Sequence, residues 1–125
     1  MCNFLHDKYS KIKPAGIGYK IFGPNQSPCF IDDSYQFEDK SGNNRWISWK
    51  KDYIGDGFCF FVSKREAFRL LKELSYYGFS DHYVYTIEYS QGLGKHIENN
   101  ITVKKVYTTA ICKRFQILDL VTESF

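Results

Sequence analysis

The sequence predicts an α+β fold, in which an antiparallel or mixed β-sheet packs against one main helix at about residues 64–76. Two observations predict it. Short apolar runs rich in Phe, Tyr, Val and Ile lie on both sides of one amphipathic helical pattern. The chain has 125 residues, of which 43% are hydrophobic and 25% charged, and this suits a single folded domain. We therefore expect residues 1–125 to form one domain, with an N-terminal segment at residues 1–15 that can be mobile.

The first expected strand covers residues 18–22 and ends at a Gly-Pro-Asn turn. Residues 28–31 can return as a second strand, and residues 35–37 form a short strand before a polar loop. Residues 45–49 alternate large and polar side chains, which predicts a strand with both Trp rings near one face.

The middle of the chain carries the clearest local pattern. The continuous apolar run at residues 58–62 predicts a buried central strand. Ser63 and Glu66 follow with the spacing of a capping box, so a helix is expected to begin there. Gly78 is expected to end it. The apolar face of this helix is expected to hold Ala67, Leu70, Leu71 and Leu74.

The C-terminal part predicts further strands. Residues 82–89 alternate, and this places Tyr83, Tyr85, Ile87 and Tyr89 on one face of a strand. Residues 91–100 are polar and contain glycine, so we expect a loop there. Residues 101–118 are rich in Val, Thr, Ile and Tyr, which indicates one long strand or two short ones.

Charge and cysteine usage narrow the function classes. The formal net charge of +3 is small for a nucleic-acid binder, so duplex nucleic acid is not indicated as a partner. Cys2, Cys29, Cys59 and Cys112 include no CxxC pair, which disfavours a zinc site. No signal segment or membrane span is visible. We expect reduced thiols, a cytoplasmic location and no membrane partner.

Motifs for catalysis, cofactors and metals are absent from the sequence. The three histidines lie near no GxSxG elbow, and the Gly-rich residues 91–95 lack the spacing of a phosphate-binding loop. Paired acids at residues 32–33 and 38–39 favour a solvated loop, with a weak cation site as the alternative. We therefore expect no cofactor and no metal.

A basic and aromatic cluster is the most suggestive feature. Aromatic residues make up 18% of the chain, and Arg and Lys are interleaved with Trp and Tyr at residues 45–53. Such side chains stack on bases and meet phosphates, and they also dominate protein hot spots. The alternative is that both Trp rings complete the core. The predicted binding residues are Arg45, Trp46, Trp49, Lys50, Tyr53, Asp56, Tyr83 and Tyr85.

Parts of the chain resemble a loosely defined group of small bacterial and phage-borne domains. The matching residues are Gly18-Tyr19-Lys20, Gly55 to Cys59, Ala67, Val84 to Tyr89, and Ala110 to Leu120. This resemblance implies a role in the biology of mobile elements, such as inhibition of a host defence system, and a location in the host cytoplasm.

The layout also resembles the core of ADP-ribosyltransferases. That family has a basic residue on an early strand, a Gly-aromatic strand running into a helix, and a later catalytic Glu. Here the segment from Gly57-Phe58 to Ala67 is similar to the middle element, and Lys20 stands where the family has Arg or His. The resemblance implies an enzyme that uses Lys20, Ser63 and Glu88 or Glu98 around a dinucleotide.

Two functions are thus expected from the sequence. The first is a non-enzymatic binding module that recognises a protein partner or a nucleotide-like ligand, with the protein partner preferred. The alternative is an enzyme similar to ADP-ribosyltransferases.

Overall fold

A computed structural model describes residues 10–23, 46–49, 57–79, 81–100 and 103–121. Within them the predicted α+β class is confirmed, with an antiparallel sheet that dominates over a single helix. The expected strands at residues 28–31 and 35–37 lie outside the described residues. The elements are β1 (Ala15–Phe22), β2 (Trp46–Ser48), β3 (Phe58–Phe60), α1 (Lys64–Tyr76), β4 (Tyr83–Asn100) and β5 (Lys105–Leu120).

Four of the strands join into a closed ring. β1 pairs with β4, β4 with β5, and β5 with β3, all antiparallel. Directly after β3, Phe61 pairs back to Tyr19 of β1 through two backbone hydrogen bonds of 2.7 Å. β2 lies beside β5 as a further short strand, in register with residues 114–116. The ring therefore has an inner face and an outer face.

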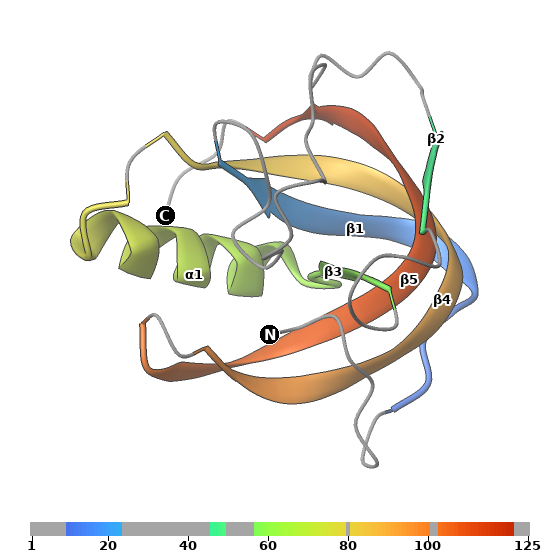
Figure 1. The fold of residues 1–125 in the computed structure, drawn as a ribbon, viewed down its shortest axis with the longest axis horizontal. Helices are drawn as coiled ribbons and strands as arrows, with labels where there is room; N and C mark the ends of the chain where they lie inside the picture. The colour runs from blue at the N-terminus through green and yellow to red at the C-terminus, as the bar shows by residue number, and fades with distance from the viewer. Residues whose placement is uncertain (1–9, 24–45, 50–56, 80, 101–102, 122–125) are drawn as a thin grey trace.

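The long strands β4 and β5 correct one sequence prediction. Residues 91–100 are not a loop, because β4 stays paired with β5 as far as Asn100. The register shifts between Gly92 and Gly94, next to Gln91 with its positive φ of 55°. β4 and β5 bend together into a C shape, and α1 runs along its opening (Figure 1).

Side chains from the strands fill two apolar clusters. The inner face of the ring holds a mostly aromatic cluster: Phe22, Phe58, Phe60, Ile87, Tyr89, Ala110, Cys112, Phe115 and Ile117. The outer face packs against α1 in a second cluster: Ile21, Phe61, Ala67, Phe68, Leu70, Leu74, Val84, Val103 and Tyr107. Adjacent residues alternate between the two clusters, as Ile21 and Phe22 do, because strand side chains alternate between faces.

The helix forms where the sequence predicts it, from Lys64 to Tyr76. Its N-terminus is capped by Ser63, whose Oγ accepts from the backbone N–H of Glu66. The Glu66 carboxylate does not complete the expected capping box, since it binds Arg69 Nε at 2.9 Å. Gly78 follows the helix with φ of 89°, a conformation that glycine adopts without strain. The helix has no membrane-spanning length or hydropathy.

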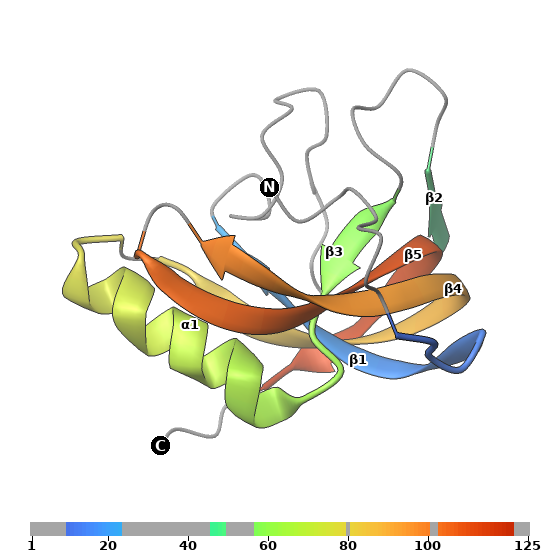
Figure 2. The ribbon, with the colours of Figure 1, turned by 90° about the horizontal axis from the view of Figure 1, so that it is seen from below.

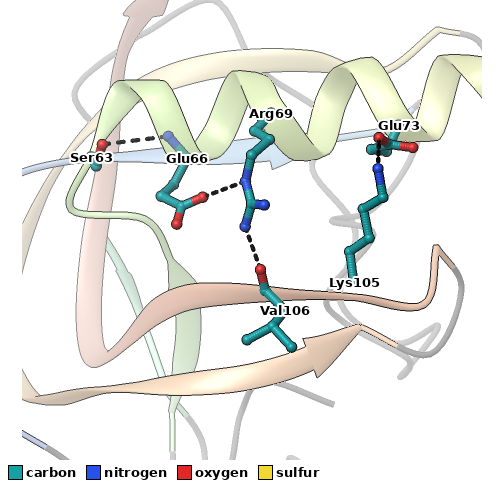
Figure 3. A network of polar contacts seen from close by, with 6 residues as sticks. All are labelled: Ser63, Glu66, Arg69, Glu73, Lys105 and Val106. Atoms are coloured by element: carbon teal, nitrogen blue, oxygen red, sulfur yellow. Dashed lines mark hydrogen bonds and ion pairs between the residues drawn. The ribbon is translucent and has the colours of Figure 1, made fainter.

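Polar contacts tie the exposed side of α1 to β5 (Figure 3). Arg69 donates through Nη2 to the carbonyl of Val106, and its guanidinium lies 4.2 Å from the centroid of the Tyr107 ring. One turn later, Lys105 pairs with Glu73. Seen from below, α1 runs alongside β5 (Figure 2). These contacts hold the helix against the end of the hairpin.

The cysteines follow the sequence prediction only in part. Cys59 and Cys112 are both buried. Cys112 is a free thiol, whereas Cys59 is disulfide-bonded. The expectation that all thiols are reduced is therefore wrong for Cys59.

Candidate functional site

The two predicted tryptophans do not share a face. Trp46 lies on the outer side of β2, where the Arg114 guanidinium stands 4.7 Å from its ring centroid. Trp49 packs against the inner cluster, with its ring 4.9 Å from that of Phe58. The prediction of one shared face is wrong because residues three apart on an extended chain point to opposite sides. Trp46 remains a binding candidate, and Trp49 is a partly buried residue that packs against the core.

The two predicted tyrosines are also separated. Tyr85 lies edge-on to Phe22, with ring centroids 5.5 Å apart, and packs against the inner cluster as a partly buried residue. Burial, and to a smaller extent the nearby Tyr83, raises the pKa of its phenol. Tyr83 itself is half exposed at the start of β4. The remaining predicted binding residues, Arg45, Lys50, Tyr53 and Asp56, lie outside the described residues.

The residues of the enzyme alternative do not converge. Lys20 points into the ring, and Glu88 belongs to the opposite face of the sheet, since it pairs with Ile17. Ser63 is occupied as the cap of α1. Glu98 stands opposite Tyr107 in the register, on the arm of the hairpin that packs against α1. No face of the described sheet therefore gathers Lys20, Ser63 and either glutamate.

Lys20 has a structural role inside the ring. It is 1% exposed, and its Nζ donates to the carbonyl of Cys59 at 2.5 Å. The same nitrogen lies 5.7 Å from the ring centroid of Phe22 and 5.9 Å from that of Phe115. A buried amine is tolerated when it has such partners. The contact joins β1 to β3 across the interior.

A surface of which the sequence singled out only Tyr83 lies where α1 ends. We define the α1-end aromatic surface as Tyr76, Tyr77, Phe79, His82 and Tyr83. Tyr76 is 82% exposed, and its ring packs edge-on against that of Tyr77. Phe79 packs edge-on against His82. Among the described residues, every aromatic side chain classed as exposed belongs to this surface.

A second group gathers on the outer face of the sheet. We define the outer-face cluster as Trp46, Glu88, Ser90, Arg114 and Gln116. Gln116 stands between Trp46 and Glu88 in the register, and Arg114 stands opposite Ser90. Gln116 Nε2 donates to Glu88 Oε1 at 2.7 Å. Here the register brings together five strand positions that the sequence alone did not connect.

The described residues contain no group of three or more His, Cys, Asp or Glu side chains that could hold a metal. No family model, curated protein or solved structure matches the chain. The case for a functional site therefore depends on the geometry of the chain's own residues.

Proposed function

We propose that this domain is a binding module that recognises a protein partner through the α1-end aromatic surface. The observation that supports the proposal is the concentration of exposed rings there. Tyr77, Phe79 and Tyr83 are 49%, 43% and 50% exposed, while every other described Phe is buried. A fold that buries its rings so thoroughly elsewhere has no packing reason to leave these in water.

The chemistry of the surface suits a protein interface. Tyr and Phe offer large, rigid contact areas at a small cost in side-chain entropy, and Tyr is enriched among hot spots. The surface is formed by the last turn of α1, the turn around Gly78 and the start of β4. Leu74 and Val84 are buried in the core and fix the end of α1 and the start of β4, so the backbone that carries the exposed rings is held in place.

The partner's identity is open to direct test. The resemblance to small phage-borne domains suggests a host defence protein as the first class to examine. The rings should contact an apolar patch on that partner, because the exposed side chains here are aromatic.

The experiment compares variants of the full chain against the partner captured from host extract and then purified. Tyr76→Ala or Tyr83→Ala should each weaken binding by about 2 kcal/mol if the ring is a hot spot. Ile97→Ala is the matched control. It removes an exposed apolar side chain near the C-terminal end of β4, away from the α1-end aromatic surface, and should leave the affinity for the partner unchanged. Wild-type affinity in both tyrosine variants, with normal folding by circular dichroism, would exclude this surface.

A further inference from the structure

We propose that the outer-face cluster binds the guanine base of a nucleotide or nucleoside. This site is separate from the α1-end aromatic surface and does not depend on the protein-binding proposal. The cluster lies on β2, β4 and β5, where adjacent strands hold its side chains in neighbouring positions on one face.

The first support is a buried acceptor that the described residues leave unsatisfied. Gln116 is 8% exposed, and its Oε1 forms no hydrogen bond within the described part of the chain. Ser90 belongs to the next residue pair on the same face, opposite Arg114. Its Oγ is likewise buried and has no hydrogen-bond partner in the described part of the chain. Buried polar atoms are nearly always hydrogen-bonded, so these two indicate a position for a ligand or ordered water.

The second support is the orientation of the amide. Because Gln116 Nε2 donates to Glu88 Oε1, the amide is fixed with its oxygen directed elsewhere. The Glu88 carboxylate forms no other hydrogen bond with the described residues, which leaves acceptor capacity next to the amide oxygen. The site therefore presents two neighbouring acceptors, one of them charged.

Among the common bases, guanine matches this pair of acceptors. Its N1–H and N2–H₂ groups are adjacent donors on one edge. Adenine and cytosine each place a ring-nitrogen acceptor beside their amino group, and uracil offers one N–H between two carbonyls. An acceptor facing the Glu88 carboxylate would be repelled, so the site should discriminate against those bases.

The third support is the stacked pair of Arg114 and Trp46 in the same outer-face cluster. The Arg114 guanidinium lies over the Trp46 ring and forms no side-chain hydrogen bond or ion pair with the described residues. Bases stack on both aromatic rings and Arg guanidinium planes. The positive charge of Arg114 also disfavours a cationic ligand, such as an arginine side chain, that would offer similar paired donors. A neutral base remains the better match.

The test titrates the full chain with GMP, guanosine and AMP by isothermal calorimetry. We expect saturable binding of one GMP, at least about tenfold tighter than AMP, because one bidentate pair distinguishes the bases. Guanosine shows whether the phosphate contributes. Glu88→Gln should weaken GMP binding at least about tenfold, whereas Glu98→Gln, a glutamate further along β4, should not change it.

A second variant covers the case in which Glu88→Gln disturbs folding. Arg114→Lys keeps the charge but removes the planar group, so it should weaken GMP and AMP binding to a similar extent. The proposal is overturned by no binding at millimolar GMP, by equal affinities for GMP and AMP, or by unchanged affinity in both folded variants. Tyr76→Ala should bind GMP normally, which separates this site from the proposed protein interface.

Discussion

The two faces of β4 and β5 use adjacent residues for opposite purposes. On the inner face, Tyr89 and Phe115 are paired in the register and pack among other rings. On the outer face, one residue away, Glu88 and Gln116 are paired and carry polar groups with spare hydrogen-bonding capacity. Packing accounts for the inner pair, but it does not account for the outer pair. Side chains that stability leaves unexplained are the better guide to function.

The largest expected effect contrasts Phe115 with Arg114. Phe115 is completely buried, with its ring centroid 4.8 Å from that of Phe58 and 6.3 Å from that of Phe22. Phe115→Ala should lower the free energy of unfolding by about 3–5 kcal/mol, through lost burial and the cavity that remains. Arg114→Ala should lower it by about 1 kcal/mol or less. Urea denaturation measures both, and similar losses would contradict the division into two faces.

A smaller effect is expected at the joint between β1 and β3. A Cβ on Gly18 would lie 2.5 Å from Cδ2 of Phe60 and 3.1 Å from the carbonyl oxygen of Phe61. Gly18→Ala should therefore destabilise the domain by about 1–3 kcal/mol through overpacking. On Gly16 the nearest atom would be the hydroxyl of Tyr89, at 3.4 Å. Gly16→Ala is the matched control and should change the free energy of unfolding by no more than about 0.5 kcal/mol.

The smallest effect on stability at neutral pH is expected from the thiol of Cys112, which lies on the inner face of the ring. Burial raises the pKa of Cys112 to about 12 from an ordinary value of 9.0, although nearby Lys20 and a backbone hydrogen bond oppose the rise. Below the ordinary value the thiol is neutral in both states, and its contribution to stability is fully present. As the pH rises towards 12, the unfolded thiol ionises first and that contribution is lost.

Iodoacetamide labelling read by mass spectrometry checks this prediction. Because the thiolate is the reactive form, Cys112 in the native domain should stay unlabelled at about pH 9, and urea should make it reactive. Labelling of native Cys112 at the rate of the unfolded chain would mean that the inner face is open to solvent.

Local patterns in the sequence predicted the helix, but of the candidate sites they predicted only single members, Trp46, Glu88 and Tyr83. Ser63, Gly78 and the apolar spacing between them are sufficient to place α1, because a helix is formed by neighbours in the chain. The outer-face cluster depends instead on the pairing of β4 with β5, which brings Glu88 beside Gln116. No local pattern contains that register.

Two further features differ from what the sequence led us to expect. The Gly-containing polar residues 91–100 resemble a loop, yet strand pairing overrides their composition. The α1-end aromatic surface left a signal that could have been found, because Tyr76 lies opposite the apolar face of the helix. A large ring on the polar side of a helix end already indicates a contact surface.

The closure between Tyr19 and Phe61 has a consequence for self-association. In the described chain, Tyr19 and Phe61 are the one backbone-paired residue pair that closes the ring, so the loss of their two hydrogen bonds would begin to uncover two strand edges. Uncovered edges are templates for adding strands from another molecule, which is how aggregates and exchanged dimers begin. Since α1 starts just after Phe61 and packs on Ile21 and Val84, the helix holds Phe61 close to β1 and so opposes the opening of the ring.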